Sequence, residues 1–237
     1  AVYGVIPNYV REDKMVLLLD AGLNQVRMGI QSGSERILEF YRRPTTLQRI
    51  KKATEIINKY RKYMIAPQYD IIVDNPVETP DDTRATVDFI YEMPRPFTLN
   101  VYSLRVIPNT QLAKDIEGKG FDIPSITKYY FAGYDQTLAN CLIFILTFWK
   151  IPRWLYKILR KKIYPITMEQ PRYPILFYLA RAGYGLGRYL DHMRLLDFTY
   201  FLGKSGYYLT KFRIVKIWRK LFWKRYHLVK QDSKVKS

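Results

Sequence analysis

A short polar turn follows an apolar run early in the chain, and its residues are of the kinds that hold a ligand at the end of a strand. The apolar run begins at Val26, and the turn Gln31–Ser34 follows it directly. Its amide and hydroxyl groups supply hydrogen-bond donors and acceptors, while Gly33 would let the backbone approach a ligand closely. Ser34 is placed to cap a helix that starts after it. The turn is therefore either a ligand-binding strand end or an ordinary strand-to-helix connection, and these residues alone leave both open.

Alternating strand and helix patterns surround this turn. Residues 1–10 indicate the end of a strand and a loop, and the run Ile71–Val73 is continuous and apolar, as expected for a strand covered on both faces. Such alternation specifies parallel strands joined by right-handed helical crossovers. Three clear strands are too few to close a barrel, so we expect half of the sheet to lie upstream. The expected strands cover 25–30, 65–73 and 98–104, and the expected helices cover 11–21, 35–41, 47–63, 81–92 and 112–117.

Three motifs stand in order at the ends of the expected strands. They are Met28-Gly-Ile-Gln-Ser-Gly-Ser34, Asp70-Ile-Ile-Val-Asp-Asn-Pro-Val-Glu-Thr79, and Phe97–Leu104 with Pro108-Asn-Thr110. Together they resemble the second half of the radical S-adenosylmethionine (SAM) barrel, especially the branch with an upstream cobalamin-binding domain. The resemblance covers about half of the chain and does not extend to residues 125–237. It implies an α/β fold, a partial parallel (β/α) barrel, followed here by a mainly α-helical basic region.

The resemblance also implies a set of SAM-binding residues at the three strand ends. The first strand end would lie near the sugar and methionine part of SAM, and the guanidinium of Arg43 would face the SAM carboxylate. An ordinary surface arginine is the alternative for Arg43. The second strand end would run beside the adenine, and the third would help to enclose it. Asp70 and Glu78 are alternatively structural, and we favour that role for Glu78. The assigned residues are Gln31, Ser32, Arg43, Ile72, Val73, Asp74 and Leu104.

The chain departs from the family pattern in its turns and in its cysteines. The turn Asp74–Thr79 lacks two glycines of the usual pattern, and Asn109 replaces a glycine but tolerates a left-handed backbone. Cys141 is the single cysteine, so the three-cysteine loop that binds a [4Fe–4S] cluster is absent. With only two histidines, we expect no metal site and no catalytic residue within this chain.

The implied activity therefore belongs to a longer protein. The resemblance implies reductive cleavage of SAM to methionine and a 5′-deoxyadenosyl radical, by a [4Fe–4S] cluster held in a missing amino-terminal half. In the cobalamin branch, a methyl group would then pass from cobalamin to the substrate. The chain opens in mid-strand character without Met, which suggests an excised piece. The alternative is a non-catalytic fragment or interaction module.

Charge divides the chain into two regions. Residues 1–120 hold 17 Lys and Arg against 15 Asp and Glu, which leaves 22 basic and 6 acidic residues for the remainder. Glycine and proline punctuate the sequence between Gly118 and Pro124. We therefore expect the barrel half to cover 1–122 and a basic, aromatic-rich helical region to cover 123–237.

The basic region predicts binding to an anionic surface. The run Leu138–Trp149 is too short to span a bilayer and is either a buried core helix or an interfacial segment. In Lys211–Tyr226, an apolar stripe lies beside lysines and arginines, which favours an anionic membrane surface over packing on the barrel, and over nucleic acid. Gly183-x-Gly-x-Gly187 is only a weak phosphate-binding pattern. Without a secretory signal or paired cysteines, we expect a cytoplasmic protein, peripheral at the inner face of the membrane.

Overall fold

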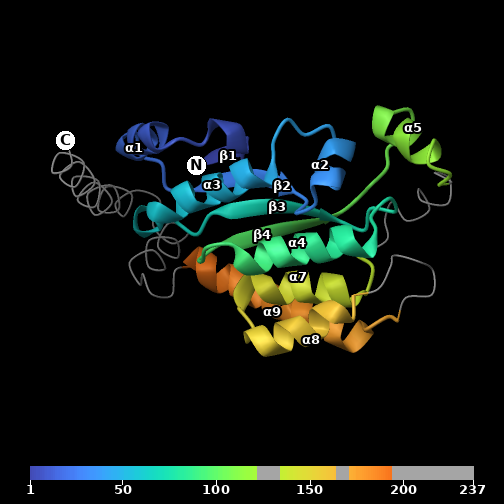
Figure 1. The fold of residues 1–237 in the computed structure, drawn as a ribbon. Helices are drawn as coiled ribbons and strands as arrows, with labels where there is room; N and C mark the ends of the chain where they lie inside the picture. The colour runs from blue at the N-terminus through green and yellow to red at the C-terminus, as the bar shows by residue number, and fades with distance from the viewer. Residues whose placement is uncertain (122–133, 164–170, 194–237) are drawn as a thin grey trace, which may run out of the picture.

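A four-stranded parallel sheet forms the centre of the protein in a computed structural model, which describes residues 1–121, 134–163 and 171–193 (Figure 1). The strands are β1 (Val2–Val5), β2 (Val26–Gln31), β3 (Gln68–Val73) and β4 (Thr98–Ser103). They pair in sequence order, and the register shifts between Gly29 and Gln31 of β2. The α/β fold and its parallel strands are confirmed. The strand expected within residues 1–10 is present as β1, the fourth strand of the sheet.

The helices of the crossovers lie on one face of the sheet, because right-handed connections between strands in sequential order all pass on the same side. Side-chain oxygens of Ser34, Thr46 and Thr79 cap three of these helices. The helix expected over 47–63 ends at Lys59, and a 3₁₀ turn follows. The helical elements are η1 (Pro7–Tyr9), α1 (Glu12–Asp20), α2 (Glu35–Phe40), α3 (Leu47–Lys59), η2 (Arg61–Tyr63), α4 (Pro80–Glu92) and α5 (Gln111–Glu117).

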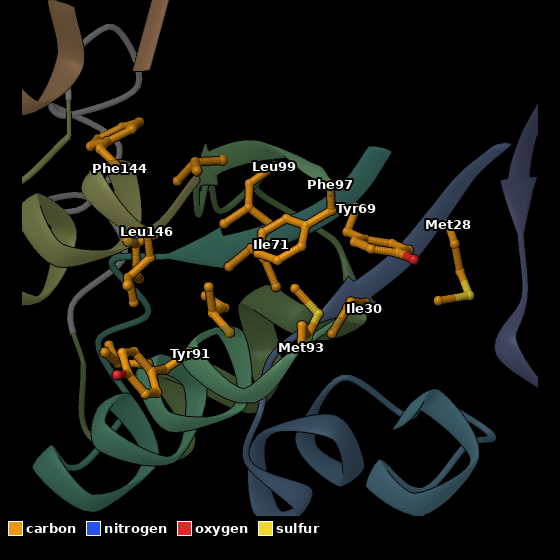
Figure 2. Close-up of a cluster of buried hydrophobic side chains, with 14 of the residues drawn as sticks. Met28, Ile30, Tyr69, Ile71, Tyr91, Met93, Phe97, Leu99, Phe144 and Leu146 are labelled. Atoms are coloured by element: carbon orange, nitrogen blue, oxygen red, sulfur yellow. The ribbon is translucent and has the colours of Figure 1, made fainter. Parts of the chain in front are cut away.

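The two faces of the sheet differ in chemistry. Met28, Tyr69 and Ile71 are fully buried in the main core, and Figure 2 shows them with Leu99 and Met93. Since side chains alternate along a strand, the intervening residues point to the opposite face, and many of these are polar. The helix-covered face therefore packs into the hydrophobic core. The opposite face, here called the barrel-lining face, is the one that lines the inside of a barrel.

Three further helices pack below the sheet in Figure 1: α7 (Leu138–Phe148), α8 (Arg153–Lys161) and α9 (Pro174–Met193). α7 packs against α4, α9 and β4, and most of its residues are buried, so it is a core helix rather than an interfacial segment. Of the described residues, none forms a helix long and apolar enough to span a membrane. The helix expected over 211–226 lies outside the described residues, and the division at 122/123 stays a prediction.

Two tyrosines from this region cover the free edge of β4. In β4, every second residue from Thr98 onward makes its backbone hydrogen bonds to β3. The backbone groups of Leu99 and Val101 therefore point away from β3. The hydroxyl of Tyr184 donates to the Leu99 carbonyl, and that of Tyr134 donates to the Val101 carbonyl, both at 2.8 Å. These bonds satisfy carbonyl groups that an open sheet edge would expose.

The glycines of Gly183-x-Gly-x-Gly187 lie within the continuous helix α9. A Cβ on Gly187 would stand 2.5 Å from Cβ of Phe148, and one on Gly183 would stand 2.5 Å from the ring of Phe148. Gly183 and Gly187 therefore let α9 approach the end of α7 closely. The motif is a helix-packing surface, in agreement with the low weight given to phosphate binding.

Candidate ligand-binding site at the strand ends

The turn after β2 is held against α4. The Ser32 hydroxyl is buried 3.1 Å from the Thr86 hydroxyl, and the Gly33 amide donates to Thr86 at 3.0 Å. A Cβ on Gly33 would stand 2.6 Å from Cα of Thr86. The absence of a side chain at Gly33 thus lets the backbone of α4 pack closely. This corrects the expectation that Gly33 makes room for a ligand. The hydroxyl of Ser32 has protein partners, so a ligand contact at this residue would have to use its backbone.

Gln31 and Arg43 meet above Gly29. Nε2 of Gln31 lies 2.6 Å from where a Cβ on Gly29 would stand, and Nη2 of Arg43 lies 3.0 Å from the same point. Gln31 has a left-handed backbone, with φ 73°, at the register shift of β2. Within the part of the chain that the structure describes, neither side chain has a hydrogen bond or ion pair. The predicted donors Gln31 and Arg43 are therefore brought together. Both remain available to a ligand that carries an anionic group or another hydrogen-bond acceptor.

The end of β3 places its three predicted residues in different surroundings. Ile72 is half-buried on the barrel-lining face, beside Tyr102 in register, whereas Val73 is buried in the core on the helix side. Asp74 follows with φ 61°, a conformation that the glycine of the family pattern would adopt without strain. Only Ile72 of these three presents its side chain to the barrel-lining face.

The Asp74 carboxylate is directed at α7 rather than at the barrel-lining face. It accepts a hydrogen bond of 2.6 Å from Nδ2 of Asn140 and one of 3.4 Å from the Asp135 amide. Burial and the nearby negative charge of Asp135 raise the pKa of Asp74 to about 6, although the Asn140 bond opposes this. A cavity of about 30 Å³ lies here between the β3 end, α4 and α7, and it is the size of a single water rather than of a nucleoside.

Leu104 lies at the junction between β4 and a small second core. Its amide donates to the Val73 carbonyl at 2.8 Å, and its side chain packs with the cluster of Val106, Ala113 and Ile116. Asn109 in the following loop has φ 66°, the left-handed conformation expected from the sequence. Leu104 therefore fixes the loop that leads to α5, next to the β3 end.

Asp82 connects the turns after β2 and β3, a role the sequence analysis did not foresee. Ser34 donates to its carboxylate at 2.5 Å, Arg36 pairs with it, and Thr79 completes a capping box with it. Burial opposes ionisation, but these hydrogen bonds hold the pKa of Asp82 below its usual range. The Thr79-x-x-Asp82 spacing is the sequence signal that indicates this cap.

Glu78, on the same turn, has the opposite electrostatics. Burial raises the pKa of its carboxyl to about 8, although the Thr83 hydroxyl, at 3.2 Å, and the charge of Arg36 act to lower it. The carboxyl therefore holds a proton at neutral pH. This agrees with the structural role favoured for Glu78.

A polar row crosses the middle of the barrel-lining face. Nε of Arg27 lies 2.8 Å from the Asp70 carboxylate, which also accepts from Nδ2 of Asn100 at 2.8 Å. Arg27 further donates to the Tyr102 hydroxyl. These contacts favour the structural alternative for Asp70, whereas Arg27, Asn100 and Tyr102 were not predicted from the sequence. Alternation along each strand is the signal that could have placed them on one face.

The described residues contain no group of three His, Cys, Asp or Glu positioned to hold a metal ion. Cys141 is buried within α7. A three-thiolate cluster site cannot be assembled from the single cysteine of this sequence.

Comparisons with known proteins find a family model and solved structures that are similar to parts of this chain. Residues 3–90, which contain most of β1 together with β2 and β3, match the model of the Radical SAM superfamily. The fold is similar to an archaeal Elp3 of Methanocaldococcus infernus lacking residues 1–46, at 20% identity and TM-score 0.46, over 65% of this chain and 34% of that chain. It is also similar to HemN of Escherichia coli, a coproporphyrinogen III oxidase described as a radical SAM enzyme, at 20% identity and TM-score 0.39, over 55% of this chain and 32% of that one. This chain thus spans about a third of the length of these structures. Among curated proteins, none matches it.

Proposed function

We propose that these residues form the SAM-binding wall of a radical SAM enzyme whose cluster-binding half lies elsewhere in the same protein. The observation that carries the proposal is the pairing of Gln31 and Arg43 over Gly29 at the end of β2, within the segment that matches the superfamily model. A planar guanidinium without an ion-pair partner among the described residues is suited to a carboxylate such as that of the methionine part of SAM.

The residues at the strand ends fit this ligand unequally. Gly29 leaves room for the two polar side chains, and Ile72 offers an apolar surface to a flat ring. The side chain of Ser32 contacts α4, that of Val73 lies in the core, and that of Asp74 bonds to α7. Ligand contacts from these three positions would therefore be made by the backbone. Leu104 would act by holding the loop beside the β3 end.

When bound, SAM and a [4Fe–4S] cluster supply the radical chemistry of this superfamily. The part of this chain is to orient SAM through Arg43 and Gln31 and to shield it from water along the barrel-lining face. The polar row of Arg27, Asp70 and Asn100 would lie on the same face, deeper in the barrel. No residue of this chain is assigned a proton transfer.

We extend the proposal to cobalamin-dependent methyl transfer on a hydrophobic or membrane-located substrate. The Asp74–Thr79 turn is the sequence feature that favours the cobalamin branch. The excess of basic and aromatic residues in the carboxyl-terminal half favours association with an anionic membrane surface, with nucleic acid as the second candidate.

The test uses the full-length protein that contains these residues, purified anaerobically and reconstituted with iron and sulfide. We expect 5′-deoxyadenosine and methionine after addition of SAM and dithionite, and at least about a tenfold higher KM for SAM in Arg43→Met. Arg49→Met, an exposed arginine on α3, serves as the control. A reconstituted cluster that yields no 5′-deoxyadenosine would overturn the proposal. Copurified cobalamin, read by its visible spectrum, tests the cobalamin branch separately.

A further inference from the structure

The inner face of α8 is fixed firmly to α4, which determines what its outer face presents. The rings of Tyr156 and Tyr91 stack with centroids 3.9 Å apart, and Nη2 of Arg160 lies 2.5 Å from the Asp88 carboxylate. The Tyr91 hydroxyl also donates to the Ile151 carbonyl at 3.2 Å, just before the helix. Arg160 is thereby neutralised and turned inward. The orientation of α8 about its own axis is set by these contacts.

The outer face of α8 combines large apolar side chains with cations. Trp154 and Ile158 lie one turn apart and are 65% and 48% exposed. Lys157 and Lys161 lie one turn apart on the adjoining row and are exposed, without an ion-pair partner among the described residues. Trp149, in the segment before α8, is 52% exposed as well. Tryptophan at such a level of exposure is costly to leave in water unless a partner covers it.

The segment that carries this face has charges of one sign. From residue 136 to residue 163 the sequence contains six Lys and Arg and neither Asp nor Glu. Two copies of this face would therefore repel each other. Nucleic acid would pair with the lysines, but an aliphatic side chain such as Ile158 offers no ring for stacking on a base. A bilayer surface with anionic lipid suits both the lysines and the apolar side chains of α8. Its headgroups attract the lysines, and the boundary with the acyl chains accepts Trp154 and Ile158.

We propose that α8 is an interfacial anchor, in which the surface of Trp154, Lys157, Ile158 and Lys161 lies on an anionic membrane. Binding is peripheral, with the axis of α8 parallel to the bilayer. The proposal names the surface for the membrane association proposed above and does not depend on SAM chemistry. The barrel would be held beside the bilayer by the α4 contacts of α8, which brings a hydrophobic substrate within reach.

The experiment measures flotation of the complete chain with vesicles of phosphatidylcholine alone, or mixed with phosphatidylglycerol, together with tryptophan emission. We expect binding to the mixed vesicles, a blue shift of the emission, and release by salt. Trp154→Ser/Ile158→Ser and Lys157→Glu/Lys161→Glu should each weaken binding at least about tenfold. All replaced side chains are exposed, so the thermal midpoint should stay close to that of the unchanged chain.

Matched controls separate α8 from general hydrophobicity and charge. Leu17→Ser removes an apolar side chain of α1 that is 67% exposed, and Lys51→Glu/Lys52→Glu reverses two exposed lysines of α3. Neither should change flotation by more than about twofold. Equal flotation of the unchanged chain and both α8 variants, with loss only in Lys216→Glu/Lys220→Glu, would reject α8 as the anchor. Absence of vesicle binding combined with tight binding to an RNA duplex would reject the membrane as the partner. SAM turnover is not read in this assay, so its failure and failure of the enzymatic proposal are distinct.

Discussion

Asp74 and Asn140 are 66 positions apart, and Nδ2 of Asn140 donates a 2.6 Å hydrogen bond to the Asp74 carboxylate. This bond connects the end of β3, at the edge where the ligand is expected, to the first turn of the core helix α7. The carboxyl-terminal helices are therefore joined to the candidate site itself, in addition to packing beside the sheet.

Replacing Asn140 with Ala should weaken this connection. A hydrogen bond to a charged group contributes about 1.5–3 kcal/mol, and we expect a loss of that size in the free energy of unfolding. The pKa of Asp74 should rise above about 6, because the Asn140 bond is among the contacts that lower it. Urea unfolding at pH 7 measures the first effect. Gln48→Ala, an exposed position on α3, should change stability by less than about 0.5 kcal/mol, and an equal loss in both variants would contradict the role of the bond.

Stability should fall as pH rises from about 5 to 8 because of Glu78. The folded chain keeps the Glu78 proton up to about pH 8, whereas the unfolded chain releases it near the ordinary carboxyl pKa. The folded state therefore binds more protons in this window, so one such group lowers the free energy of unfolding by up to about 1.4 kcal/mol per pH unit.

Glu78→Gln should flatten this dependence, since the amide cannot ionise. The measurement is the urea midpoint at several pH values between 5 and 8.5, with Glu55→Gln on the exposed face of α3 as control. An unchanged pH profile in Glu78→Gln would show that other groups determine the dependence.

Two glycines of α9 should respond oppositely to the same substitution. Gly187→Ala would place a Cβ 2.5 Å from Cβ of Phe148, which cannot move without its backbone, so we expect a loss of about 1–3 kcal/mol. At Gly185 no atom lies within 4 Å of the new Cβ, and the helix interior favours Ala over Gly by about 0.5–1 kcal/mol. Thermal unfolding of the two variants provides the comparison, and a gain in both would mean that α7 and α9 are not in close contact.

Gly29→Ala should disturb the ligand site while leaving the fold intact. The new Cβ would displace the ends of two flexible side chains, Gln31 and Arg43, rather than backbone. We expect a change of less than about 1 kcal/mol in stability but several-fold weaker SAM binding in the reconstituted full-length protein. Gly33→Ala is the contrasting variant, because its Cβ would meet the backbone of α4 and should destabilise the fold directly. Undiminished SAM affinity in Gly29→Ala would place the ligand elsewhere.

The sequence by itself determined the order of strands and helices and the position of the caps. These features are local: periodic burial, a hydroxyl before a helix and a residue that tolerates positive φ are all readable within a few positions, as Ser34 and Asn109 show. Gln31 and Arg43 were singled out by the resemblance of the strand-end motif, and the structure places both side chains beside Gly29, while their ligand role stays a prediction.

Only the tertiary structure decided which way the remaining side chains point. Ser32 and Asp74 stand at the expected strand ends, but their groups turn to Thr86 of α4 and Asn140 of α7. The row of Arg27, Asp70 and Asn100 likewise joins three strands. Such contacts depend on strand register and helix packing across long separations, and burial patterns along one segment do not encode which partner a polar group meets.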